Sequence, residues 1–243
     1  MKIRAVIFDI YGTLLEVGPP PADARERWER LCKDRFGRPA RLTLDAFMAK
    51  CEKIIAREHD TARTAGVRHP EIFWPSVARE ALPELERLPD AGGDDFLFEH
   101  AQLQRTVRLM PGAATTLATL AERRIVLGLA SNCQPYTLRE LDHDLSGAKL
   151  DRSIFTHELC FFSFVAGFSK PDPRVFRWLR DRLQLRGVPP SETLMVGDRH
   201  DNDIEPAEKQ GFQTWLLAGA PFPGKHAGGD WSALDSHLST LLV

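Results

Sequence analysis

The sequence predicts an α/β fold, a Rossmann-like and doubly wound parallel sheet that carries an inserted block of helices. The chain opens with an apolar run, Ile3 to Phe8, whose lack of alternation is typical of a strand buried on both faces of a parallel sheet. Strand-like and helix-like segments alternate in the second half of the chain. Between them, residues 22–108 show helical spacing and no convincing strand. We therefore expect a core of residues 1–16 and 109–243 and a helical insertion of residues 17–108.

The first strand is expected to end at Asp9, and Gly12 marks a tight turn directly after it. The prolines of Pro19–Pro21 then break the chain and predict a hinge or linker. Prolines and glycines cut the insertion into short helices. Their apolar positions recur at helical spacing, as in Trp28, Leu31, Cys32, Phe36, Phe47, Cys51, Ile54 and Ile55.

The second half of the chain contains the remaining strands and helices of the predicted sheet. Helices are expected at residues 113–122, 135–143, 173–183, 203–210 and 231–242. Strands are expected at residues 125–130, 193–196 and 213–217, with a further short one at 154–156. Ligands of such sheets bind beyond the carboxyl ends of the strands. Because Asp9, Ser131 and Asp198 each stand at such an end, the sequence predicts that they share one site.

Composition and charge exclude several classes of protein. The 243 residues carry a formal net charge of −2, and 43% are hydrophobic, which is ordinary for a soluble globular chain. This balance lacks the basic excess of nucleic-acid binders, and no apolar run approaches the ~18 residues of a membrane span. The start of the chain lacks the pattern of a signal peptide, and the four cysteines form no C-x-x-C pair. We expect a cytoplasmic protein without disulfides that binds neither nucleic acid nor membranes.

Acidic residues at two strand ends suggest a metal site. The segment Gly197–Asp203 holds three carboxylates and an amide, and clustered carboxylates repel unless a cation or proton lies among them. Hard oxygen ligands of this kind suit magnesium. Asp9 could be a metal ligand, a nucleophile or both. The alternatives are a solvated acidic loop with helix-capping aspartates, and a turn aspartate held by loop amides.

Two further motifs could bind an anion. Ser131 and Asn132 close a predicted strand, where a hydroxyl and an amide can donate to an oxyanion or cap a helix. Lys170 lies in a loop stiffened by Pro171 and Pro173, where its ammonium could lie over an anionic site or be solvated.

The order and spacing of these four motifs resemble those of the haloacid dehalogenase-like hydrolase superfamily. The motifs are Asp9-Ile10-Tyr11-Gly12-Thr13-Leu14, Ser131-Asn132, Lys170-Pro171-Asp172-Pro173, and Gly197-Asp198 with Asp203 five residues later. The resemblance covers residues 1–16 and 109–220, and the insertion lies where the family places its helical cap.

The resemblance implies covalent catalysis. Asp9 would attack phosphorus or carbon, and water would hydrolyse the aspartyl intermediate. The transferring group would be bound and neutralised by Thr13, by Ser131 or Asn132, and by Lys170. Magnesium would be held by the Asp9 carboxylate, the main-chain carbonyl of Tyr11, and Asp198, with support from Asp203.

The sequence departs from the family's phosphatases at Tyr11, where they carry the aspartate that acts as general acid and base. A phenol, with a reference pKa of ~10, is a poor replacement at neutral pH. The first motif instead resembles that of the 2-haloacid dehalogenases, which attack carbon without a metal. Those enzymes lack the Gly197-Asp198 motif, and Asp198 and Asp203 beside Asp9 require a cation.

The metal motif therefore decides our interpretation of the function. We expect a magnesium-dependent hydrolase of a small phosphorylated metabolite. The alternatives are a 2-haloacid dehalogenase-like hydrolase and a catalytically weak member that binds a ligand or partner. The insertion carries no motif that indicates a substrate.

Overall fold

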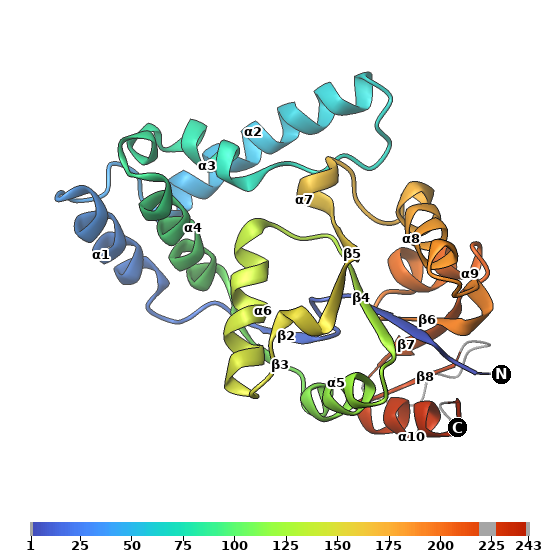
Figure 1. Ribbon diagram of the computed structural model, residues 1–243. Helices are drawn as coiled ribbons and strands as arrows, with labels where there is room; N and C mark the ends of the chain where they lie inside the picture. The colour runs from blue at the N-terminus through green and yellow to red at the C-terminus, as the bar shows by residue number, and fades with distance from the viewer. Residues whose placement is uncertain (1, 219–226, 242–243) are drawn as a thin grey trace.

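The computed structural model describes residues 2–218 and 227–241 and confirms the predicted α/β class. Its six parallel strands follow the order β5-β4-β1-β6-β7-β8 (Figure 1). They are β1 (Ala5–Phe8), β4 (Val126–Ser131), β5 (Phe155–Phe162), β6 (Thr193–Gly197), β7 (Gln213–Leu217) and β8 (Gly228–Gly229). Because β1 pairs with both β4 and β6, the carboxyl ends of these three strands lie side by side.

Helices pack on both faces of the sheet. One face is covered by α5 (Ala113–Glu122), α6 (Pro135–Gly147) and α10 (Trp231–Leu241), and the other by α8 (Pro173–Leu185) and α9 (Glu205–Glu208). Val6 and Phe8 of β1 point into the first core, and Ala5 and Ile7 point into the second. Alternating side chains of a strand leave on opposite faces. Both faces of β1 are therefore apolar, which explains the unbroken apolar run in the sequence.

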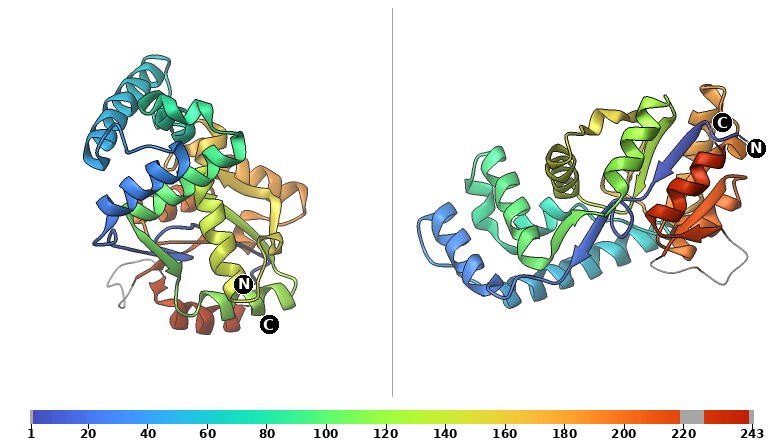
Figure 2. Two further views of the ribbon diagram at one scale, coloured as in Figure 1. Left: turned by 90° about the vertical axis from the view of Figure 1, so that its left-hand side faces the viewer. Right: turned by 90° about the horizontal axis from the view of Figure 1, so that it is seen from below.

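A block of helices, residues 24–104, lies to one side of the sheet and away from both termini (Figures 1 and 2). This helical insert contains α1 (Ala24–Phe36), α2 (Leu44–Thr64), α3 (Trp74–Ala81), the 3-10 turn η1 (Pro83–Arg87) and α4 (Asp90–Gln104). It has its own core, which is built around the buried side chains of Trp28, Phe47 and Phe96. Although α2 is 21 residues long, no helix in the described ranges is long and apolar enough to cross a membrane.

The insert joins the core through a two-stranded antiparallel ribbon that the sequence analysis missed. The ribbon consists of β2 (Leu15–Gly18) and β3 (Thr106–Leu109), paired from Leu15–Leu109 to Gly18–Thr106. The prediction of an all-helical segment up to residue 108 was therefore wrong, and the expected boundaries after residues 16 and 108 fall inside these strands. Each strand has only four residues, and its partner lies some ninety residues away in the chain, so neither carries a local signal.

Three other elements differ from the prediction. The short strand expected at 154–156 extends to Phe162 as β5 and is followed by α7 (Ser163–Ala166). The helix expected at 203–210 is a π-helical turn, His200–Ile204, followed by α9. In this way Asp203 comes to lie in the turn and is buried against β6. The last helix ends at Leu241, and residue 242 lies outside the described residues.

The insert also contacts the core at the carboxyl end of the sheet. The main-chain N–H of Glu71 donates to the carbonyl of Gly167 at 3.1 Å, and the N–H of Trp74 donates to the side chain of Gln134 at 2.8 Å. On the other side, α4 packs along α6, where Asp95 and Arg139 form an ion pair at 3.0 Å. The insert therefore covers the edge of the sheet where the sequence predicts the site.

A histidine lies in the centre of the insert's aromatic core. His100 is 1% exposed, stacks on Trp74 with ring centroids 5.6 Å apart, and meets the edges of Phe47 and Trp28. Neither ring nitrogen has a hydrogen-bond partner among the described residues. Burial, assisted by the charge of Arg105, lowers the pKa of His100 to about 3, so the imidazole is neutral in the folded protein.

We predict that His100 makes the protein sensitive to acid. Below pH ~6.5 this histidine is protonated in the unfolded chain but stays neutral in the folded chain. The folded state therefore has its full free energy of unfolding above pH ~6.5 and loses part of it as the pH falls toward 3. From pH 8 to pH 5, His100 should lower the free energy of unfolding by about 2 kcal/mol. His100→Phe should remove this part of the pH dependence of the free energy of unfolding, measured with urea at both pH values. His157→Gln, at an exposed histidine, should leave it in place. An unchanged pH dependence in His100→Phe contradicts the prediction.

Candidate active site

The structure brings the predicted site residues together at the carboxyl edge of the sheet. Asp9 follows β1, Ser131 ends β4 and Asp198 follows β6. Lys170 comes from the loop between α7 and α8, and its Nζ lies 2.8 Å from Asp9 Oδ1 and 2.5 Å from Asp203 Oδ1. The carboxyl ends of β1, β4 and β6 therefore lie at one edge of the sheet, and Lys170 reaches Asp9 and Asp203 there.

Three carboxylates meet in this site. One oxygen each of Asp9, Asp198 and Asp203 lies within 4.8 Å of the others. Burial, reinforced by the charge of Asp9, raises the pKa of Asp198. Burial also raises the pKa of Asp203, and the ammonium of Lys170 offsets part of that effect. With three carboxylates and one ammonium, the ionised cluster has a surplus of two negative charges, which fits a divalent cation with oxygen ligands.

Two glycines leave the space that the acidic side chains occupy. A β-carbon at Gly12, where φ is +77°, would lie 2.2 Å from Oδ2 of Asp198. A β-carbon at Gly197 would lie 2.4 Å from the carboxyl group of Asp203. Both distances are far below van der Waals contact, so the carboxylates can approach Asp9 only because these positions lack a side chain.

Lys170 is a fixed cation in the floor of the site. It is 4% exposed; burial opposes its charge, but the carboxylates of Asp203 and Asp9 outweigh this effect and raise the pKa of Lys170. Asn132 holds its main chain, because Nδ2 donates to the Lys170 carbonyl at 2.9 Å and Oδ1 accepts from the Lys170 N–H at 2.7 Å. Both polar atoms of Asn132 are thus engaged in positioning the lysine.

Two buried hydroxyls of the site lack a partner within the described part of the chain. Thr13 and Ser131 are 0% and 1% exposed, and neither Thr13 Oγ1 nor Ser131 Oγ makes a hydrogen bond there. Buried polar groups rarely remain unpaired. Ser131, unlike Asn132, is therefore available to donate to a ligand oxyanion, and so is Thr13.

Tyr11 makes its contacts beside the acidic cluster. Its hydroxyl donates to Glu140 and lies 2.8 Å from Thr137 Oγ1, and the guanidinium of Arg105 lies over its ring at 4.6 Å. Burial and the neighbouring Glu140 raise the pKa of Tyr11 above its ordinary value, although Arg105 opposes the shift. The sequence analysis missed Glu140, Thr137 and Arg105, since only the tertiary fold brings them to Tyr11.

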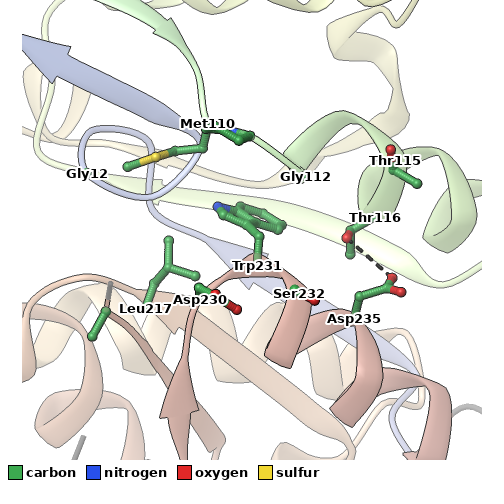
Figure 3. Close-up of a pocket in the computed structure, with 12 residues that line it drawn as sticks. Gly12, Met110, Gly112, Thr115, Thr116, Leu217, Asp230, Trp231, Ser232 and Asp235 are labelled. Atoms are coloured by element: carbon green, nitrogen blue, oxygen red, sulfur yellow. Dashed lines mark hydrogen bonds between the residues drawn. The ribbon is translucent and has the colours of Figure 1, made fainter. Parts of the chain in front are cut away.

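A groove of about 650 Å³ borders the other side of the loop that follows Asp9 (Figure 3). Met110, Leu217 and Trp231 line it, and Trp231 Nε1 donates to the carbonyl of Thr13 at 3.2 Å. Gly12 is its one lining residue from the four motifs. Asp9, Asp198 and Asp203 are therefore not among the residues that line the groove.

Two curated relatives differ in their named activities. The chain is 33% identical to a phosphoserine phosphatase of Thermus thermophilus over 150 residues, which are 60% of this chain and 55% of that protein. The match thus spans about half of that relative's length. The chain is 29% identical to (S)-2-haloacid dehalogenase 4A of Burkholderia cepacia over 218 residues, 88% of this chain and 82% of that protein.

Solved structures and a family model agree on the fold. A 2-haloacid dehalogenase from Pseudomonas syringae aligns over 98% of this chain and 99% of its own, with a TM-score of 0.59 and 20% identity. A HAD phosphatase from Thermococcus onnurineus aligns over 100% of both chains, with a TM-score of 0.56 and 22% identity. The model of the haloacid dehalogenase-like hydrolases matches residues 3–211. The chain therefore belongs to the haloacid dehalogenase-like hydrolase family.

Proposed function

We propose that this hydrolase is a magnesium-dependent phosphatase of a small phosphorylated metabolite. The observation that carries the proposal is the surplus of two negative charges where Asp9, Asp198 and Asp203 meet Lys170. A divalent cation relieves this repulsion, whereas attack on carbon needs no metal and would leave the surplus charge in place. The Asp9 carboxylate, the main-chain carbonyl of Tyr11, and Asp198 would hold the ion, and Asp203 would support it. When bound, magnesium would neutralise charge on the phosphoryl group.

The reaction would proceed in two steps. An oxygen of Asp9 attacks phosphorus, the bond from phosphorus to the leaving oxygen breaks, and its electron pair departs with the leaving group. Water then attacks the aspartyl phosphate, which releases inorganic phosphate and restores the Asp9 carboxylate. The hydroxyls of Thr13 and Ser131, which lack partners among the described residues, would donate to the phosphoryl oxygens, and the Lys170 ammonium would balance their charge.

Tyr11 affects which leaving groups this site can expel. Its hydroxyl already donates to Glu140, and its pKa is raised, so it is a weaker acid than free tyrosine. A leaving alkoxide would therefore receive no proton from this position, whereas an aryl or acyl phosphate needs none. We propose that the substrates have leaving groups of this second kind.

The second candidate is a 2-haloacid dehalogenase-like hydrolase, in which Asp9 displaces halide from carbon and water cleaves the resulting ester. Tyr11 in place of a carboxylate favours it, as does similarity to a dehalogenase over 88% of this chain. A catalytically weak protein that binds a ligand is the third. Assays of phosphate esters, acyl phosphates and 2-haloacids, each with and without magnesium, separate the three.

We predict that Asp9→Asn lowers kcat by at least about 10³-fold, because the amide is nearly isosteric with the carboxylate but a far weaker nucleophile. Steady-state kinetics with p-nitrophenyl phosphate measure the loss, and far-UV circular dichroism verifies the fold. A variant that keeps more than about a tenth of kcat rules out covalent catalysis by Asp9.

We predict that magnesium stabilises the folded protein. At a concentration of 100 times Kd the gain is about 2.7 kcal/mol, seen as a higher melting temperature with magnesium than with chelator. Asp198→Ala should abolish the shift. Asp201→Asn is the matched control in the same loop, because Asp201 is exposed and pairs with Arg199 at 2.7 Å. Full phosphatase activity in chelator excludes a catalytic metal.

We predict a steep dependence on the leaving group. Aryl and acyl phosphates should be hydrolysed about 10²- to 10⁴-fold faster than alkyl phosphates, the usual range of general acid assistance. The ratio of kcat/KM for p-nitrophenyl phosphate and glycerol 3-phosphate measures it. If aryl and alkyl phosphates are hydrolysed at equal rates, and the chemical step is shown to be rate-limiting, the inference that position 11 supplies no general acid is wrong.

A further inference from the structure

A buried carboxylate joins three separate parts of the chain. Glu140 lies on α6 and is 1% exposed. Around it gather Tyr11 from the loop after β1, Gln102 from α4, and Arg105, which links α4 to β3. With Thr137, these residues form what we call the Glu140 cluster. Among the described residues, the side-chain contacts of this cluster do not involve Asp9, Asp198 or Asp203.

Both oxygens of Glu140 are fully engaged. Oε1 accepts from Gln102 Nε2 at 2.7 Å, and Oε2 accepts from the Tyr11 hydroxyl and from Arg105 Nη2, the latter at 3.1 Å. The Arg105 guanidinium stacks over the Tyr11 ring at 4.6 Å and also hydrogen-bonds to its hydroxyl. A buried carboxylate without hydrogen-bond partners lowers the stability of the folded protein. Loss of any of these contacts is therefore unfavourable, and Glu140, Tyr11 and Arg105 hold one another in place.

The cluster touches the reacting segment through a single side chain. Tyr11 lies two residues after Asp9 and directly before Gly12, against which the Asp198 carboxylate packs. Arg105 lies at the point where the helical insert returns to the core. Displacement of Tyr11 would therefore shift the main chain between Asp9 and Gly12, and displacement of the insert would remove two of the partners of Glu140.

We propose that Glu140 is a positioning residue, which fixes Tyr11 against the insert and thereby holds the main chain of Asp9–Gly12 in its reactive position. It acts through Tyr11 and does not touch the reacting atoms. The proposal rests on the proposed role of Asp9 as nucleophile. In this proposal Tyr11 acts through the contacts of its hydroxyl with Glu140 and Arg105 and not as a general acid.

A second ion pair provides a matched control. Asp95 on α4 and Arg139 on α6 join the same two helices at 3.0 Å, but their side chains are 45% and 44% exposed. Neither contacts Tyr11. Asp95→Ala should therefore weaken the same interface and leave kcat within about twofold, because exposed ion pairs contribute little.

A double-mutant cycle tests the proposal. Tyr11→Phe and Glu140→Gln should each lower kcat about tenfold. The double variant should also lose about tenfold and not a hundredfold, since under the proposal Glu140 affects kcat only through its contact with Tyr11. The loss should be the same for p-nitrophenyl phosphate and for glycerol 3-phosphate. An acid role of Tyr11 would instead affect mainly the alkyl phosphate. Additive losses, an unchanged kcat in Tyr11→Phe, or a loss confined to the alkyl phosphate overturns the proposal.

The positioning role of Glu140 can be tested even if the proposed phosphatase activity is wrong. If the wild type hydrolyses no phosphate ester but dehalogenates (S)-2-chloropropionate, the phosphatase proposal fails, and the cycle is measured on that reaction, which also uses Asp9. Amide hydrogen exchange gives a readout independent of turnover. Glu140→Gln and Tyr11→Phe should speed exchange in residues 9–15 and 102–106, and Asp95→Ala should not. Unchanged exchange in residues 9–15 contradicts the positioning role.

Discussion

The arrangement of the candidate active site depends on the balance of charges around Lys170. Its ammonium lies between Asp9 and Asp203, and Asp198 adds a third carboxylate within 4.8 Å. One buried cation cannot neutralise three ionised carboxylates, so the cluster requires a further positive charge or a proton. Gly12 and Gly197 have no side chain at points where a β-carbon would collide with these acidic groups. Asn132 fixes the main chain of the lysine itself.

The parallel sheet is what allows such a cluster to form. Since β1 lies between β4 and β6, residues more than a hundred positions apart reach the same edge of the sheet. The helical insert contacts this edge through Glu71, Trp74 and the packing of α4 on α6. The site is thus built from rigid strand ends beneath a separately packed unit with its own core.

Family membership establishes a hydrolase, and two of the relatives carry different named activities, a phosphatase and a dehalogenase. The acidic cluster favours the chemistry of a metal-dependent phosphatase, and Tyr11 is the feature that the dehalogenase motif shares. Under the positioning role that we propose for Glu140, the hydrogen bonds of Tyr11 with Glu140 and Arg105 give the phenol a part in holding the loop. Tyr11 can then replace a carboxylate while Asp9 keeps its position.

The sequence by itself determined the α/β class and most core elements, and it predicted that Asp9, Ser131 and Asp198 lie at neighbouring strand ends, because strand periodicity and strand-end motifs are local signals. Lys170 lies in a loop, and only the resemblance to the family linked it to these residues. Only the tertiary structure showed the β2–β3 ribbon, the π-helical turn that buries Asp203, and the partners of Tyr11. Glu140 and Arg105 lie 129 and 94 residues from Tyr11, and an ordinary helical glutamate or a linker arginine gives no sign of its partner. Contacts of this kind are decided by the packing of the insert on the core, which no local pattern encodes.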